Sequence, residues 1–332
     1  MSLQRHRRYA KMDFKKLHIF AQVLLCLFSF TLLAGCGSPP GETGLYEKKT
    51  SEAAGSAGDK GSWDSTPKVL TPTADGLVTY GNEAALIDAS HTQDGYIMAT
   101  YLGSSSKVKL QIKGPDGVTY TYDMKQGGYD TFPLSAGDGS YDIGVYENIA
   151  GDKYSTAFFQ TIDVQLKDEF TPFLYPNQFV NYNKDTEAVA LAQELSAGAG
   201  SGLDVVTNIY HYVIDNISYD DEKAVDPPTG YLPDLDETLD TKKGICFDYA
   251  SLMTCMLRSQ GIPTKLQIGF SGEIKHAWIS TYLEETGWVD NIIEFDGRDW
   301  ELMDPTFAAN TDAAQLKKYI GDGSNYTLQY SR

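Results

Sequence analysis

The chain has 332 residues, of which 42% are hydrophobic, and it carries a formal net charge of −18 at pH 7. A chain of this length can form more than one domain with its own core. An acidic protein repels phosphate backbones and anionic lipid headgroups. The charge therefore argues against nucleic-acid binding and against attachment to a membrane through a basic patch.

The first 35 residues have the three parts of a secretory signal peptide. Six lysine and arginine residues precede an apolar run at about 17–33, and small residues follow it. The sequence Leu33-Ala34-Gly35-Cys36 resembles the lipobox of bacterial lipoproteins, in which the cysteine thiol is diacylated and becomes the new N-terminus. This resemblance implies that residues 1–35 are removed and that Cys36 anchors the chain to the extracytoplasmic face of the cell membrane.

Two alternatives stay open at this end of the chain. Met12 could be the true start, because Lys15 and Lys16 suffice as a basic head. The apolar run is also just long enough to span a bilayer, so it could remain as an uncleaved anchor.

Removal of residues 1–35 takes away six basic residues and one aspartate, which changes the net charge from −18 to −23. Attachment must then come from the lipid, and a diacylated cysteine supplies the two chains that stable anchoring needs. Residues 36–68 are rich in glycine, serine, proline, glutamate and lysine. We expect them to form a flexible linker.

Residues 69–168 are expected to form an all-β domain. Val108, Leu110 and Ile112 alternate with polar residues, and a glycine- and proline-rich turn follows, which predicts a hairpin with one apolar face. Several short strands within about 100 residues suit an immunoglobulin-like or fibronectin-like sandwich. We expect this domain to bind a partner or to act as a spacer. Further strands are expected at 95–102, 141–146 and 158–166.

Residues 169–332 show helical periodicity first and strands afterwards, which is the order of an α+β domain. A proline-rich acidic stretch at 226–240 is expected to be a loop. A helix at 246–260 ends at Gly261 and Pro263, which are stop signals. The other expected elements are helices at 185–195 and 203–217, strands at 265–270 and 276–283, and a strand-like run at 300–303.

Cys246 and Cys255 are the cysteines that follow the predicted lipidation site. Nine residues along one helix correspond to about 13.5 Å, whereas a disulfide needs Cα atoms within roughly 7 Å. We therefore expect two free thiols, with Cys255 as an apolar structural residue. Cys246 falls in the first helical turn, where unpaired N–H groups and the helix dipole favour an anion. We expect a lowered thiol pKa and an oxyanion site there.

His276 and Asp304 are the candidate partners of this thiol. His276 begins a strand and would act as the base that activates the nucleophile. His211 is the alternative base, but it lies off the apolar stripe of its helix. Asp304 ends a run that could pair beside the strand of His276, and it would orient the imidazole. Asp290 is the alternative for this third position.

Four local motifs stand in the second half of the chain: Gly244 to Ala250, Leu257 to Pro263, His276 to Trp278, and Asp304 to Thr306. Taken together, they resemble the transglutaminase-like superfamily. The resemblance covers about 182–307 and implies a papain-related α+β core, which the all-β immunoglobulin-like sandwich expected at 69–168 would precede as a separate domain. It implies Cys246 as nucleophile, His276 as general base and acid, and Asp304 as the orienting partner.

Two further points follow from this resemblance. Members of the superfamily often carry a second oxyanion donor opposite the helix N-terminus, and Tyr219 is a candidate for it. The stretch from His276 to Asp304 spans 28 residues, more than in the simplest members. We expect an extended hairpin at about 289–297 that shapes access to the site.

Acidic side chains cluster within the expected loop and could in principle hold calcium, which prefers oxygen ligands. Their spacing lacks the central glycine and the distal glutamate of a helix-loop-helix calcium site. We therefore expect a solvated loop, no metal and no cofactor. The acidic residues are Asp234, Asp236, Glu237 and Asp240.

The expected chemistry is acyl transfer through a thioester on Cys246. Transfer to water would make the protein a peptidase or amidase, and transfer to a lysine amine would make it a transamidase. Hydrolysis is slightly favoured because water is abundant. The expected partners are a protein or peptide substrate, such as a cell-wall peptide, and the lipid bilayer. The alternative is a non-catalytic surface binding or adhesion lipoprotein with a vestigial triad.

Overall fold

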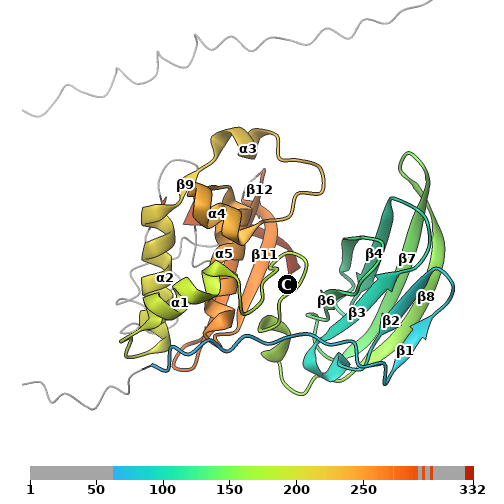
Figure 1. Ribbon diagram of the computed structural model, residues 1–332, viewed down its shortest axis with the longest axis horizontal. Coiled ribbons are helices and arrows are strands. Elements are labelled where there is room, and N and C mark those ends of the chain that lie inside the picture. The colour runs from blue at the N-terminus through green and yellow to red at the C-terminus, as the bar shows by residue number, and fades with distance from the viewer. Residues whose placement is uncertain (1–62, 272, 291–293, 296–299, 302–325) are drawn as a thin grey trace, which may run out of the picture. The chain divides into compact units, whose positions relative to one another are not determined.

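The computed structural model describes residues 63–271, 273–290, 294–295, 300–301 and 326–332 (Figure 1). The expected signal peptide and Cys36 lie outside these residues. Among the helices that are described, none is both long and apolar enough to span a bilayer.

The first half of the described chain is rich in β-structure and forms two four-stranded antiparallel sheets. One sheet has the order β1-β2-β3-β6 and the other has the order β5-β4-β7-β8. The strands are β1 (Thr79–Gly81), β2 (Ala85–Asp88), β3 (Tyr96–Tyr101), β4 (Val108–Lys113), β5 (Thr119–Met124), β6 (Asp130–Pro133), β7 (Gly139–Ala150) and β8 (Lys153–Val164), with a 3₁₀ turn η2 at Thr92–Asp94.

The buried faces of the two sheets share one hydrophobic cluster, which includes Ile87 and Ile97 from the first sheet and Leu110 and Ile143 from the second. Side chains on β4 alternate between buried and more exposed positions, as the sequence pattern requires. β4 and β5 pair in register, and Gly117 closes their turn with a φ of 80°. This confirms the hairpin expected from the sequence.

The second half is a mixed α/β core. Its four-stranded sheet has the order β13-β12-β11-β16, and two short two-stranded ladders accompany it. The helices are η3 (Thr171–Phe173), α1 (Glu187–Ser196), α2 (Gly202–Asn216), α3 (Asp221–Val225), α4 (Leu235–Thr241) and α5 (Cys246–Ser259). The strands are β9 (Ser218–Tyr219), β10 (Lys243–Gly244), β11 (Thr264–Ser271), β12 (Ile274–Leu283), β13 (Gly287–Val289), β14 (Glu294–Phe295), β15 (Trp300–Glu301) and β16 (Tyr326–Ser331).

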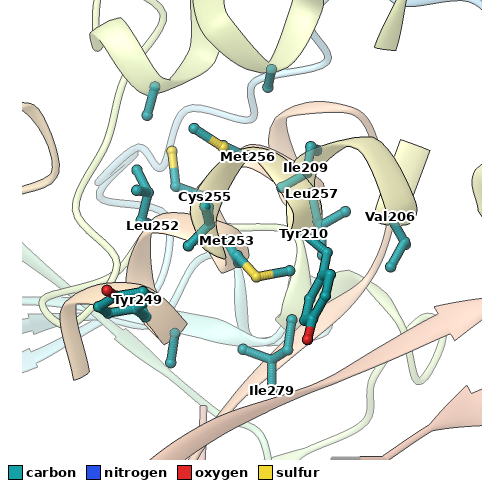
Figure 2. Close-up of a cluster of buried hydrophobic side chains, with 14 of the residues drawn as sticks. Val206, Ile209, Tyr210, Tyr249, Leu252, Met253, Cys255, Met256, Leu257 and Ile279 are labelled. Atoms are coloured by element: carbon teal, nitrogen blue, oxygen red, sulfur yellow. The ribbon is translucent and has the colours of Figure 1, made fainter. Parts of the chain in front are cut away.

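Helix α5 is the centre of this core, because its residues from Asp248 to Ser259 are all buried. It packs against α1, α2 and α4 and against β11 and β12. Figure 2 shows its side chains extending in several directions, toward Tyr210 of α2 and toward Ile279 of β12. Cys255 is fully buried in this cluster, and burial raises the pKa of its thiol. Both described cysteines are free, as expected.

A buried arginine fixes the end of α5. Arg258 is fully buried, and its guanidinium donates to three backbone oxygens. Nε donates to Thr264 at 2.9 Å, Nη1 to Tyr175 at 2.6 Å and Nη2 to Arg332 at 2.9 Å. Burial lowers the pKa of Arg258 to about 10, so the group stays charged at neutral pH. This one side chain joins α5 to the start of β11 and to the segment before α1.

Three segments differ from the sequence expectations. Residues 63–68, expected to belong to the linker, contact the core: Lys68 N–H donates to Ser259 O at 2.6 Å. The expected loop at 226–240 contains α4, because Asp234 caps this helix by accepting from the N–H of Glu237. Within the run at 300–303, the described part is β15, which pairs with β14 and not with the strand of His276. β12 pairs with β11 along most of its length, whereas β13 pairs with it only from Thr281 to Leu283, beyond His276.

Replacement of Arg258 by methionine should destabilise the fold strongly. The three backbone oxygens would lose their donor inside the core, and we expect the free energy of unfolding to fall by about 3 kcal/mol or more. Urea denaturation measures this change. The matched control is Lys109→Met, which removes a surface ion pair with Asp123 and should change the free energy by less than about 1 kcal/mol. Equal effects of the two substitutions would contradict the role given to Arg258.

Candidate active site

Cys246 is the first residue of α5, as the sequence predicts. The short parallel ladder of β9 and β10 precedes it and pairs Gly244 with Tyr219. This ladder holds Tyr219 beside the start of the helix. A Cβ on Gly244 would lie 2.6 Å from Cβ of Asp248, so glycine is required for the chain to enter the helix at this angle.

A buried carboxylate organises the first turn of α5. Asp248 is fully buried and accepts from the backbone N–H of Ile245 at 2.8 Å. It also accepts from the hydroxyl of Tyr231 and, at 3.5 Å, from Nζ of Lys223. These contacts tie the proline-rich segment that contains Tyr231 to the helix N-terminus. Because this segment forms one wall of the site, Asp248 sets the shape of the cavity without lining it.

A cavity of about 520 Å³ opens at the N-terminus of α5. Cys246, His276 and Tyr219 all line it, so the structure brings together three of the residues chosen from the sequence. Phe179, Tyr231, Phe247 and Tyr330 supply aromatic walls, and Thr121 of β5 contributes from the β-rich half. The cavity is thus built from several elements that are distant in the sequence.

Burial raises the pKa of the Cys246 thiol above its ordinary value. Backbone hydrogen bonds from Ala277 and Phe247 act in the opposite direction, and the negative charge of Asp248 adds to the increase. This corrects the expectation that the helix N-terminus lowers the thiol pKa. Loss of hydration outweighs the helix amides, because protein atoms surround much of the sulfur even though Cys246 keeps partial exposure in the cavity. At neutral pH the free protein therefore holds a thiol at Cys246.

His276 lies on β12, where it pairs with Gly269 of β11. Its side chain is 6% exposed, and burial lowers its pKa to about 4, so the imidazole is neutral at physiological pH. The ring stacks with Trp278 at a centroid distance of 6.1 Å. The backbone of Ala277 hydrogen-bonds to the sulfur of Cys246. Because His276 is the residue before Ala277, this contact keeps the strand of His276 next to the thiol.

Tyr219 lies close to both the sulfur and the backbone of Cys246. Burial raises the pKa of Tyr219 to about 12, and proximity to the Cys246 sulfur also raises it, while a backbone hydrogen bond from Cys246 lowers it. The hydroxyl of Tyr219 therefore stays protonated and lies near the first N–H of α5. A protonated hydroxyl and a helix N–H at one point are the donors that an oxyanion requires.

Asp290 does not lie beside His276. Its Oδ1 accepts from the hydroxyl of Ser280 at 2.5 Å. Ser280 is four residues beyond His276 on β12, a separation of about 13 Å along an extended strand, and Trp278 lies between them. This geometry disfavours the alternative triad member. Asp304 lies outside the described residues.

The remaining candidates are placed away from the cavity. His211 lies on α2 and contacts Tyr210 edge to face at 5.8 Å. Within the acidic stretch, Asp234 caps α4 and Asp236 accepts from the N–H of Glu187 at 3.0 Å. In the part of the chain that the structure describes, no group of three or more acidic, histidine or cysteine side chains is arranged to hold a metal ion.

A known family matches part of the chain. Residues 189–291 match the sequence model of the transglutaminase-like superfamily, and this segment contains both Cys246 and His276. The chain thus carries a transglutaminase-like core. A comparison with curated proteins finds no significant match.

Three solved structures have some similarity to the chain. A protein assigned as a cysteine protease of Cytophaga hutchinsonii gives a TM-score of 0.34 and 12% identity, over 77% of this chain and 74% of that one. A protein assigned as a protease of Parabacteroides distasonis gives 0.29 and 11%, over 60% and 62%. The transglutaminase of red sea bream gives 0.25 and 15%, over 64% and 48%. The chain spans less than two thirds of the last two proteins. At these scores the similarity carries no weight for the chemistry of the site.

Three residues at or beside the site were not identified from the sequence. Asp248 stands within the motif around Cys246, and its position three residues after Ile245 is the spacing of a helix-capping acid, a signal that was available. Tyr231 and Arg332 line the cavity from distant segments. Only the fold brings them there, so no local pattern could have identified them.

The depressed pKa of His276 makes a prediction about stability. The folded protein binds fewer protons than the unfolded chain between the ordinary pKa of 6.5 and the folded value of about 4. The contribution of the neutral imidazole to the free energy of unfolding is therefore complete above pH 6.5, and it is lost as the pH falls toward 4. The full change is on the order of 3 kcal/mol.

Urea denaturation from pH 7 to pH 4 measures this contribution. His276→Gln should unfold with a shallower loss of stability over that range than the wild type. His211→Gln, which changes a histidine outside the cavity, should keep the wild-type slope. An identical pH dependence in all three proteins would show that His276 is not buried in its neutral form.

Proposed function

We propose that this protein is a cysteine enzyme that acts on peptide or glutamine amide bonds through Cys246. The observation that carries the proposal is the convergence of Cys246, His276 and Tyr219 on one cavity at the N-terminus of a buried helix. The match of residues 189–291 to the transglutaminase-like superfamily supports the same chemistry. Asp304 is the proposed orienting partner of His276, since Asp290 is engaged with Ser280.

The shifted pKa values suggest how the nucleophile is activated. A raised thiol pKa and a lowered imidazole pKa both favour the neutral pair, so a thiolate and an imidazolium would not coexist stably in the free protein. Proton transfer from Sγ of Cys246 to His276 would then accompany attack on the substrate carbonyl. The negative charge passes from sulfur to the carbonyl oxygen. There the N–H of Cys246, which donates to the oxygen of Tyr219 in this structure, would turn to the oxyanion, and the hydroxyl of Tyr219 would donate its own proton to it.

The remaining steps return the enzyme to its starting state. His276 gives the proton to the departing amine, the carbon–nitrogen bond breaks, and a thioester remains on Cys246. His276 then takes a proton from the second substrate as that substrate attacks the thioester, and it returns the proton to sulfur. With water the product is a carboxylic acid, and with a lysine amine it is a new amide. We favour hydrolysis, hence a peptidase or amidase.

The proposed location is the extracytoplasmic face of a cell membrane, with a lipid on Cys36 as the anchor. Support comes from the basic head, the apolar run and the small residues before Cys36. A protein or peptide near the membrane, such as a cell-wall peptide, would then be the substrate. The alternative function is a binding or adhesion lipoprotein with an inactive triad.

We also propose that the β-rich half is an immunoglobulin-like sandwich. The strand order supports this: β2 and β3 share a sheet with β6, while β4, β7 and β8 are consecutive in the other sheet. The chain therefore changes sheets after β3, after β5 and after β6, as in Greek-key sandwiches. Thr121 of this half lines the cavity, so the domain would help to form the substrate site.

Mass spectrometry of a peptide library after incubation with the protein tests the proposed reaction. A cut backbone, conversion of glutamine to glutamate, or a new crosslink would distinguish peptidase, amidase and transamidase. Cys246→Ala should abolish every such product, whereas Cys255→Ala should keep them if it folds. If the products persist in Cys246→Ala, a residue other than Cys246 carries the activity. If the wild type gives no product, the alternative function, a non-catalytic binding or adhesion lipoprotein, is favoured.

The third member of the triad has its own test. Asp304→Asn should preserve the fold but reduce turnover by a factor on the order of 10⁴, because the amide would hold the wrong imidazole tautomer. Asp290→Asn is the matched control and should keep turnover within about tenfold, since a lost hydrogen bond to Ser280 is worth roughly 1 kcal/mol. The opposite pattern would assign the role to Asp290.

A further inference from the structure

The walls of the Cys246 cavity carry positive charge in a protein that is acidic overall. Among the described residues that line it, Lys275 and Arg332 are cationic, and no aspartate or glutamate is present. The whole chain has a net charge of −18. A cationic cavity in such a protein indicates a local requirement of the site, because the general composition supplies mostly carboxylates.

The backbone of Arg332 is held firmly. Its N–H donates to Leu266 at 2.8 Å, and its carbonyl accepts from the N–H of Leu266 at 2.7 Å. The carbonyl also accepts from Nη2 of Arg258 at 2.9 Å. The guanidinium of Arg332 therefore projects from a fixed point on the edge of the sheet.

The side chain of Arg332 is surrounded by aromatic rings yet keeps unused donors. Its guanidinium carbon lies 4.1 Å from the ring centre of Phe179, 4.8 Å from Tyr330, 5.2 Å from Tyr120 and 5.4 Å from Tyr122. The residue is 3% exposed. In the described part of the chain, Nε and Nη1 of Arg332 are buried and reach no acceptor within hydrogen-bond geometry. The hydroxyl of Tyr122, buried and also without such a partner, is the polar group near the guanidinium, and Arg332 opposes the rise in the pKa of Tyr122 that burial causes.

This arrangement suits a ligand better than a purely structural role. Aromatic rings stabilise the charge of a guanidinium through their faces, but they leave its N–H groups in the ring plane unsatisfied. Buried N–H donors without partners destabilise a protein until an acceptor reaches them. A carboxylate matches the forked geometry of a guanidinium and can take two parallel hydrogen bonds from it.

We infer that the Cys246 cavity selects substrates that carry a carboxylate and that Arg332 receives this group. The inference rests on the proposed function, since it names the class of peptide that the site would accept: one with a free carboxylate near the amide to be attacked. Lys275 also lines the cavity, but it is exposed, so solvent weakens its attraction for the carboxylate. The carboxylate belongs either to an acidic side chain or to the α-carboxyl group of a short peptide.

The first experiment compares two alkylating agents of nearly equal size, iodoacetate and iodoacetamide. In each reaction the sulfur of Cys246 displaces iodide, and only the charge of the reagent differs. The ratio of the iodoacetate rate to the iodoacetamide rate at Cys246 should exceed the ratio for glutathione by about tenfold or more, the gain expected from one charge-assisted hydrogen bond. Arg332→Met should return the ratio to within about twofold of glutathione, because it removes that bond.

Lys265→Met is the matched control. Lys265 also lies over aromatic rings, at 3.7 Å from Trp288 and 4.9 Å from Phe173, but it does not line the cavity. Its substitution should leave the ratio unchanged. An unchanged ratio in Arg332→Met would overturn the inference and assign Arg332 to packing alone.

The second experiment measures binding without chemistry, in the full-length Cys246→Ala protein. N-acetylglutamate α-amide carries only a side-chain carboxylate, N-acetylglutamine carries only an α-carboxylate, and N-acetylglutamine amide is neutral. At least one of the two acids should raise Tm, and the more effective one identifies the source of the carboxylate. The neutral compound should raise Tm less than that acid does. Equal shifts for all three compounds, or no shift with either acid, would overturn the inference.

The two experiments separate this inference from the proposed function. A Cys246 that reacts with neither agent would argue against the enzyme, while the Tm measurement still decides whether the cavity binds carboxylates. If Arg332→Met does not fold, Arg332→Lys keeps the charge but lacks the fork, and it should reduce the alkylation ratio and the Tm shift. If Arg332→Lys keeps the wild-type alkylation ratio and the wild-type Tm shift, the inference that the guanidinium binds the carboxylate through two parallel hydrogen bonds is overturned.

Discussion

The position of helix α5 governs the rest of this structure, and a buried charged residue fixes each of its ends. Asp248 holds the first turn through Ile245, Tyr231 and Lys223, and Arg258 holds the last turn through three backbone oxygens. Between them the helix is buried on all sides (Figure 2). A helix fixed in this way can present Cys246 at a defined point, because neither rotation nor translation is possible without breaking buried hydrogen bonds.

The burial that positions the site also sets its electrostatics. Desolvation raises the pKa of the Cys246 thiol and lowers that of His276, so the two groups are neutral when the cavity is empty. The same burial leaves the guanidinium of Arg332 enclosed by aromatic rings with donors to spare. A substrate with both a carbonyl and a carboxylate would then bind at two points of one cavity, with the carbonyl at Cys246 and the carboxylate at Arg332. Reactivity and selection of the substrate have a common physical origin in this account.

Much of this organisation can be predicted from the sequence where the signal is local. The helical period before Gly261 predicts α5, and the alternation from Val108 to Ile112 predicts β4; the structure contains both. The motif around Cys246 also predicts where α5 begins. Effects that depend on tertiary packing were missed. The sign of the thiol pKa shift depends on how much protein covers the sulfur, and the acidic stretch became α4 because Asp234 caps it. Arg332 reaches the cavity only through the pairing of its backbone with Leu266.

The central claim is that Cys246 is a nucleophile served by His276. The most direct measurement is the rate of iodoacetamide labelling of each cysteine at neutral pH, in the wild type and in His276→Ala. The account predicts that Cys246 is labelled much faster than the fully buried Cys255, and that loss of the imidazole slows Cys246 by at least about tenfold, the lower range of a general base. Equal, slow labelling of both cysteines, or labelling of Cys246 that does not depend on His276, would contradict it.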